Sequence, residues 1–345
     1  MNAVLAGLGT AEAPHPVAQD EARRFAQATV VRSRPALARM LDVFDRAGIE
    51  RRTLAAPLAF LEAAPSFAAR NDRFAACAPA LAAAAARSAL DDATVPPADV
   101  RGVVLTCSTG LAAPNLDRNL VFDLGLDPGV RRAPLWGLGC AGGVAATALA
   151  ADLAVALDGP VLAVAIETCS LAFVPSDPSR ANLVACALFG DGAAAAVLAP
   201  SGDGPTVTAH RSHLVPDTVE AMGWDVVDAG LKVRFAPTLP GIVARHVGPA
   251  TAALARAAGL ARFDRFALHP GGPKILDAYA EALRPPADDL AAARAVLHRH
   301  GNMSSPTALF VLDRLRRATP PAAGQTLAML ALGPGLAVEG LVLRW

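Results

Sequence analysis

The sequence lacks an excess of either charge. Among its 345 residues, 31 Lys and Arg side chains balance 31 Asp and Glu side chains, and charged residues make up only 18%. Such a chain has no broad positive field to hold a phosphate backbone, so we expect no nucleic-acid partner. Hydrophobic residues make up 53%, which is ample for a core and excludes intrinsic disorder.

Cysteine is also sparse, and no two cysteines have the spacing of a metal-binding pair. An odd number of isolated thiols in a chain of this size indicates reduced cysteines in a cytoplasmic protein, with neither a disulfide framework nor a metal site. The five are Cys77, Cys107, Cys140, Cys169 and Cys186.

Neither a targeting leader nor a long hydrophobic run is evident. The apolar stretch Met1–Thr10 has no basic residues before it, which argues against a signal peptide. The longest charge-free stretch, Ala318–Val338, is interrupted by three prolines. We therefore expect no membrane span.

What the sequence does contain is an alternation of short apolar runs and long helical patterns, which predicts a layered α/β fold. Continuously apolar runs are typical of strands that are buried on both faces. We predict strands at Val100–Thr106, Pro160–Glu167, Ala193–Pro200, Asp264–Leu268 and Leu327–Leu332, and helices at Pro79–Leu90, Gly143–Leu157, Gly241–Ala258 and Asp288–Arg299.

A weak internal repeat suggests two similar halves. A glycine-rich turn and an apolar strand follow both Phe189 and Gly333. The loop Ser201–Pro205 is the best boundary candidate, so we divide the chain into residues 1–202 and 203–345.

Cys140 is the first candidate for chemistry. It lies among four glycines, in GLGCAGG, where an apolar approach turns into a helix. A thiol at a helix N-terminus faces unpaired N–H groups, which favour the thiolate. A helix end supplies only about 0.3–1 kcal/mol, whereas lowering a thiol pKa from about 8.5 to about 6 takes roughly 3.4 kcal/mol. A cationic neighbour is therefore required, and histidine is the natural one.

His269 and Asn302 complete a candidate set. His269 ends a predicted strand and is followed by a Pro-Gly-Gly turn, which is where α/β folds place functional groups. Asn302 follows the helix-ending Gly301. Cys, His and Asn in this order fit a papain-like hydrolase, in which Asn orients His. They also fit a carbon–carbon condensing enzyme, in which His and Asn both donate to a thioester oxygen. A hydrolase needs an exposed cleft and water, whereas this chain offers apolar strands and glycine-lined interior turns.

Five motifs together resemble the type III polyketide synthases, the chalcone synthase-like family. They cover about residues 40–345 in the family's order. The motifs are GLGCAGG around Cys140, ALFGDGAA around Phe189, HPGGPKIL from His269, GNMSS from Gly301 and GPG-x-x-x-E from Gly333. The resemblance implies a thiolase-like fold with two similar α/β halves in an αβαβα arrangement, assembled as a homodimer.

The resemblance also implies roles for individual residues. Cys140 would take the starter acyl group from a CoA thioester. His269 would keep Cys140 ionised and, with Asn302, stabilise the enolate formed when malonyl-CoA loses CO₂. Phe189 would flank the catalytic centre, and Lys274 and Arg46 would contact CoA. The substrates are acyl-CoA and malonyl-CoA, and no cofactor is implied.

Further residues would shape the cavity. Ser304 and Gly335 would line it, and Val233 stands where plant members have a second gatekeeper Phe; we do not expect Phe235 to replace it. A Met that crosses the plant dimer is Ala113 here, and Glu50 occupies a usually basic position.

Two segments, ETCSLAF from Glu167 and MGWDVVDAG from Met222, are similar to bacterial alkylpyrone and alkylresorcinol synthases. In that branch Cys169 and Thr109 would lie beside a tunnel for a fatty acyl chain. The resemblance therefore implies an acyltransferase that extends a medium- or long-chain fatty acyl-CoA and cyclises the product. The alternatives are a β-ketoacyl-carrier-protein synthase III-like enzyme and a catalytically silent scaffold with the same fold.

Overall fold

The computed structural model describes residues 2–345, and it confirms the α/β layered fold. Nine strands form one mixed sheet in the order β11-β12-β13-β8-β1-β7-β6-β4-β5. Their bounds are β1 Val4–Glu12, β4 Gly102–Thr106, β5 Arg131–Leu135, β6 Val161–Thr168, β7 Asp191–Ala199, β8 Thr206–Leu214, β11 Arg265–Leu268, β12 Thr326–Gly333 and β13 Ala337–Arg344.

The sheet consists of two parts that meet at one residue pair. Val4 of β1 pairs with Thr206 of β8, while β1 pairs with β7 along its whole length. On one side β6, β7 and β1 are neighbours, and on the other β12, β13 and β8 follow the same antiparallel pattern. The glycine-rich segment after Phe189 leads into β7, and the glycine-rich segment at Gly333 leads into β13.

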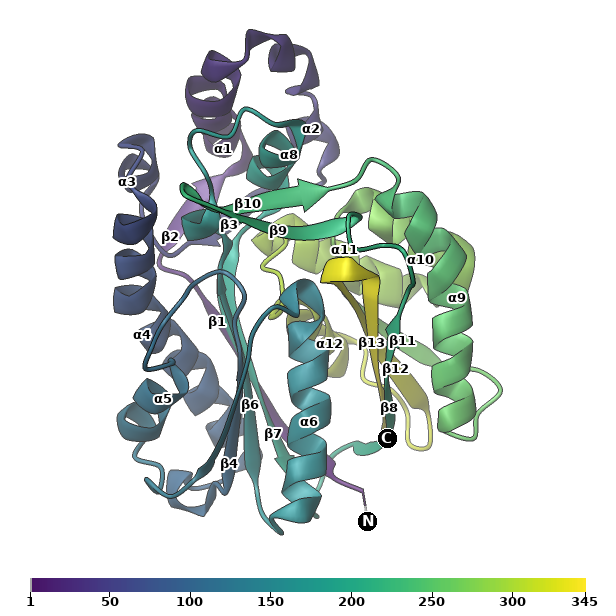
Figure 1. Cartoon of the computed structure of the whole chain (residues 1–345). Coiled ribbons are helices and arrows are strands. Elements are labelled where there is room, and N and C mark those ends of the chain that lie inside the picture. Colours follow the sequence, from purple (N-terminus) through teal and green to yellow (C-terminus); the bar gives the residue numbers. More distant parts are fainter. Residues whose placement is uncertain (1) are drawn as a thin grey trace.

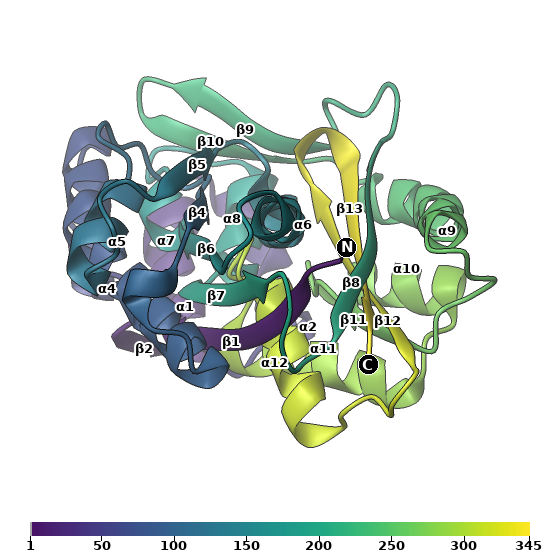
Figure 2. The same cartoon turned by 90° about the horizontal axis from the view of Figure 1, so that it is seen from below.

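Helices complete five layers, which Figure 2 shows nearly edge-on. α4 and α5 cover the outer face of the first sheet part, α6 and α12 lie between the two parts, and α9 and α10 cover the second. The longer helices are α4 Phe67–Ala93, α5 Asp117–Leu124, α6 Gly142–Ala156, α9 Leu239–Ala257, α10 Pro273–Leu283, α11 Ala287–His300 and α12 Thr307–Ala318.

A smaller lobe and a hairpin lie at one end of these layers (Figure 1). The hairpin consists of β9 Met222–Val227 and β10 Gly230–Phe235. The lobe contains β2 His15–Ala18, β3 Arg51–Leu54, α1 Gln19–Ala26, α2 Val43–Arg46, α3 Leu58–Glu62, α7 Cys169–Ala172 and α8 Arg180–Leu188.

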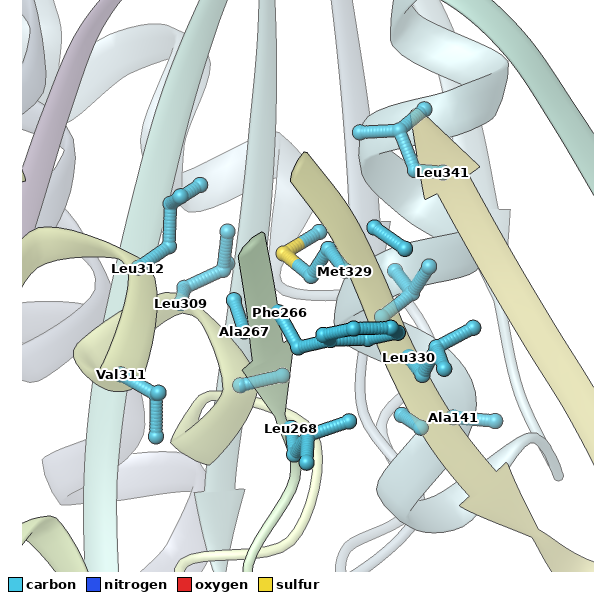
Figure 3. Packing of buried hydrophobic residues seen from close by; sticks show 14 of the residues in the cluster. Ala141, Phe266, Ala267, Leu268, Leu309, Val311, Leu312, Met329, Leu330 and Leu341 are labelled. Carbon is cyan, nitrogen blue, oxygen red and sulfur yellow. The ribbon is translucent and has the colours of Figure 1, made fainter. Parts of the chain in front are cut away.

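Burial on both faces explains the apolar strands. In β6, Leu162, Val164 and Ile166 join the hydrophobic cluster beneath α4, while alternate residues join the cluster between the sheet parts. The latter cluster includes Leu268, Leu330 and Ala141, the residue after Cys140 (Figure 3). The core thus extends to the turn that carries Cys140.

One predicted boundary was wrong. The helix predicted at Pro79–Leu90 begins twelve residues earlier as α4, with Ser66 as its N-cap and Pro79 in its interior. An interior proline destabilises a helix by about 3 kcal/mol. The helix continues because Phe74, Ala78 and Ala82 are buried against the sheet, and this tertiary packing outweighs the local penalty.

The segment Gly139–Ala156, which includes α6, is long and apolar enough to cross a membrane by length and composition alone. It is 61% buried as the middle layer of the fold. Within residues 2–345, no group of three or more His, Cys, Asp or Glu side chains is arranged to hold a metal ion.

Candidate active site

Cys140 lies where the sequence predicts it, in a 3₁₀ turn (Gly139–Ala141) that leads into α6. Gly139 has φ +49°, and its N–H donates to Ser108 Oγ at 3.0 Å. A Cβ at this position would lie 2.7 Å from Cδ of Pro334. The turn between β12 and β13 therefore packs directly on the cysteine turn, and only glycine fits between them.

Asn302 lies beside the sulfur. Its Oδ1 is 4.0 Å from Cys140 Sγ and accepts a hydrogen bond from Ser304 N at 2.8 Å. Its Nδ2 donates to Gly271 O at 3.3 Å, two residues beyond His269. These backbone partners fix which end of the amide is the donor. They also bring the cysteine turn, the histidine turn and the GNMSS segment to one place.

His269 directly follows β11, and its backbone N–H donates to Leu330 O at 2.9 Å. The side chain is only 1% exposed, and neither ring nitrogen has a hydrogen-bond partner within residues 2–345. A buried imidazole without partners is costly unless a ligand supplies them. This side chain is therefore available for a substrate.

Burial shifts the pKa values of both side chains. It raises the pKa of the Cys140 thiol to about 11 and lowers the pKa of His269 to about 3. Both shifts oppose the thiolate and imidazolium expected from the sequence, because burial penalises the charged forms. The ionisation of Cys140 by His269 stays a prediction.

Glu167, which the sequence analysis did not select, lies behind the cysteine turn at the end of β6. Its carboxylate accepts hydrogen bonds from Ser108 N at 2.9 Å, Thr109 Oγ1 at 2.7 Å and Ser305 Oγ at 2.8 Å. The side chain is fully buried, and burial raises its pKa to about 7. Glu167 thus ties the end of β4 and the GNMSS segment together beneath Cys140.

Glu167 gives the protein a pH-dependent stability. Its folded pKa of about 7 exceeds its usual 4.5, so between these values the folded state binds more protons than the unfolded state and stability falls as pH rises. We expect the free energy of unfolding of Glu167→Gln, relative to that of the wild type, to be about 3 kcal/mol higher at pH 8 than at pH 5. Urea unfolding of both proteins at both pH values measures it, with the exposed Glu62→Gln as control. An equal stability difference at both pH values would refute the shift.

A largely apolar pocket, which is open to solvent, adjoins the site. Phe189 lies between this pocket and Asn302, with which it forms a parallel backbone bridge. Cys169 and Val233, both predicted to line the cavity, line this pocket. Its lining also includes Arg52, Ala185, Cys186 and Trp224.

Phe235 and Thr109, both considered for the cavity, lie in different surroundings. Phe235 does face Phe189, with ring centroids 5.9 Å apart, because residues two apart on β10 share a face. Thr109 does not line the apolar pocket. Its hydroxyl donates to Glu167 and accepts from Thr168 N at 2.8 Å, which turns it into the buried polar network.

The remaining predicted residues lie around these features. Ser304 is buried, and a hydrogen bond with its side chain offsets part of the rise that burial causes in the pKa of the Cys140 thiol. Gly335, with φ +64°, occupies the β12–β13 turn, and its carbonyl accepts from Thr218 Oγ1 at 2.9 Å. Lys274 is exposed in the first turn of α10, and Arg46 is exposed and paired with Asp42.

A five-layer αβαβα fold with a Cys, a His and an Asn assembled at one end of its sheets defines a thiolase-like acyltransferase. Models of the chalcone and stilbene synthases match nearly the whole chain, the N-terminal domain at residues 2–202 and the C-terminal domain at residues 206–345. The chain therefore belongs to the chalcone and stilbene synthase family, the type III polyketide synthases.

Individual relatives are consistent with this family. The 1,3,6,8-tetrahydroxynaphthalene synthase of Streptomyces peucetius subsp. caesius is 35% identical over 351 residues, covering 99% of this chain and 93% of the relative. Bisdemethoxycurcumin synthase of Oryza sativa subsp. japonica is 34% identical over 375 residues, covering 99% and 92%. The crystal structure of the tetrahydroxynaphthalene synthase of Streptomyces coelicolor A3(2) superposes with a TM-score of 0.93 at 28% identity, covering 100% of this chain and 99% of that one.

Proposed function

We propose that this enzyme transfers a medium- or long-chain fatty acyl group from CoA to Cys140, extends it with malonyl-CoA, and releases an alkylpyrone or alkylresorcinol. The observation that carries the proposal is the apolar pocket beside Phe189. A fatty chain there would gain about 0.8 kcal/mol per buried CH₂, which favours long starters over acetyl.

The site supports each chemical step. Neutral His269 accepts the Cys140 proton as the sulfur attacks the thioester carbonyl, and CoA leaves as its C–S bond breaks and regains that proton. When malonyl-CoA loses CO₂, the electrons of the broken C–C bond form an enolate, whose oxygen accepts hydrogen bonds from Asn302 Nδ2 and His269. The enolate carbon then attacks the acyl group and expels Sγ. Such preorganised donors are typically worth about 10²–10³ in rate each.

Further parts of the proposal rest on the family resemblance. Lys274 and Arg46 would bind the phosphates of CoA, no cofactor other than the CoA thioesters would be needed, and the enzyme would be a cytoplasmic homodimer. Exposed Trp136 and Phe122 are consistent with a partner surface, since isolated protein would otherwise leave these large rings in water.

The relatives favour a second candidate. Two of them are named for tetrahydroxynaphthalene, a product without an alkyl side chain. An enzyme making such a product would not need a fatty starter. The presence or absence of an alkyl chain in the product therefore separates the two candidates.

A starter panel from acetyl-CoA to palmitoyl-CoA with malonyl-CoA tests the proposal, with products identified by mass spectrometry. We expect alkylated products, and at least a hundredfold higher kcat/KM for the best long starter than for acetyl-CoA, because four buried methylenes already supply about 3.2 kcal/mol. Product from malonyl-CoA alone, with no long-chain product, would favour the second candidate. Product only with an acyl-carrier protein would contradict both.

A further inference from the structure

Arg52 has an unusual position for a charged side chain. It lies on β3 in the lobe and is only 2% exposed. Its Nη1 donates to Cys186 O at 2.9 Å and Phe189 O at 3.0 Å, and its Nη2 donates to Ala187 O at 3.0 Å and to the side-chain oxygen of Gln19. Burial lowers its pKa to about 10, so it stays charged at neutral pH.

These carbonyls belong to the C-terminal turn of α8 and the residue that follows it. The last carbonyls of a helix have no partner within the helix, and a cation stabilises them. Within residues 2–345, no carboxylate lies within ion-pair distance of Arg52. The backbone carbonyls therefore hold this guanidinium, and its planar fork matches three of them at once.

The segment that Arg52 holds also holds Asn302. Asn302 N donates to Leu188 O at 2.8 Å, and Gly190 N donates to Asn302 O at 3.0 Å. A Cβ at Gly190 would lie 2.4 Å from His300 O, so the segment of Gly190 and the segment of Asn302 are in close contact. A shift of residues 186–190 must therefore move the backbone of Asn302.

The same segment carries Phe189, whose ring packs against Phe235 and, at 6.5 Å between centroids, against Trp224. Arg52 itself lines the apolar pocket on which Phe189 borders. The guanidinium of Arg52 thus contacts the backbone of residues 186–189. This segment carries Phe189 in the pocket wall, and it is hydrogen-bonded to the backbone of Asn302, whose side chain lies beside Cys140.

We propose that Arg52 is a positioning residue that sets Asn302 for enolate stabilisation and Phe189 as the wall of the starter pocket. This inference rests on the roles given to Asn302 and Phe189 in the proposed function. Arg52 touches no reacting atom in it, and acts through the backbone of residues 186–190.

Arg52→Lys is the primary test, because lysine keeps the charge and loses the planar fork. With malonyl-CoA alone, we expect kcat for decarboxylation to fall about ten- to a hundredfold as one oxyanion donor is misplaced, while KM changes less than about threefold. Alkylation of Cys140 by iodoacetamide should keep its stoichiometry, and discrimination between acetyl-CoA and palmitoyl-CoA should weaken.

Arg70→Met is the matched control. Arg70 is 1% exposed and donates to Leu171 O, Pro65 O and Ala229 O, none of which lies in residues 186–190. Its loss should lower Tm but leave the decarboxylation kcat within about twofold of the wild type, since Asn302 is not displaced.

Wild-type kcat and starter preference in Arg52→Lys would overturn the inference, as would an equal fall in the Arg70 control. If Arg52→Lys does not fold, Gln19→Leu replaces it, because Gln19 accepts from Arg52 and donates to Ala187 O at 3.2 Å. A folded Gln19→Leu protein should lose at least about threefold in kcat, and an unchanged kcat overturns the inference. A wild-type protein that does not decarboxylate malonyl-CoA would instead overturn the proposed function.

Discussion

Cys140→Ala is expected to lower polyketide formation by at least about 10⁴-fold, because Cys140 is the thiol beside Asn302, where the proposed enolate attacks the acyl group. Decarboxylation of malonyl-CoA should persist, since His269 and Asn302 remain to stabilise the enolate. Mass spectrometry of the intact protein after incubation with acyl-CoA should show the acyl adduct on the wild type and none on the variant.

Cys77→Ala provides the control. Cys77 lies on α4, half-buried, and its thiol contacts Phe74 O rather than any residue of the site. This variant should form the adduct and the product at wild-type rates. An acyl adduct that survives Cys140→Ala, or one that disappears with Cys77→Ala, would show that a different nucleophile is used.

Ala185→Phe is expected to convert a long-chain enzyme into a short-chain one. Ala185 is on α8 and lines the apolar pocket, so a phenyl ring there would occupy the space of about five methylenes. At about 0.8 kcal/mol each this is about 4 kcal/mol, or roughly a thousandfold in kcat/KM for palmitoyl-CoA. Acetyl-CoA should be used as before. Competition between the two starters, read from product masses, measures the ratio.

Ala181→Phe is the matched control, because Ala181 lies one turn earlier on α8 and is not part of the pocket lining. It should leave the ratio within about twofold of the wild type. If Ala185→Phe also leaves the ratio unchanged, the pocket does not hold the starter, and the fatty acyl assignment is wrong.

The candidate catalytic residues were predictable because each one lies in a local turn with its own sequence signature. Glycines flank Cys140, Pro-Gly-Gly follows His269, and Gly301 precedes Asn302. The structure places Cys140 before α6, His269 after β11 and Asn302 in the turn before α12, and it brings Asn302 within 4.0 Å of the Cys140 sulfur. Their catalytic roles remain predictions that the variants above test.

Glu167 and Arg52 could not be identified in this way. Glu167 stands within an apolar run, and Arg52 is one of two adjacent arginines, of which Arg51 is less buried and pairs with Glu12. Nothing within a few residues distinguishes them. Their functions arise from partners as distant as Ser305 for Glu167 and Phe189 for Arg52.

By itself, then, the sequence determined the layered α/β class, because apolar strands and helical periodicity fix which faces are buried, and its resemblance to a known family implied the five-layer arrangement. It also determined which turns carry the cysteine, histidine and asparagine. Tertiary structure alone decided that burial shifts the pKa values of the thiol and the imidazole toward their uncharged forms, that Phe235 faces Phe189, and that Thr109 belongs to a polar network. The physical reason is range: turn geometry depends on neighbours in the chain, whereas desolvation and side-chain contacts depend on segments that only folding brings together.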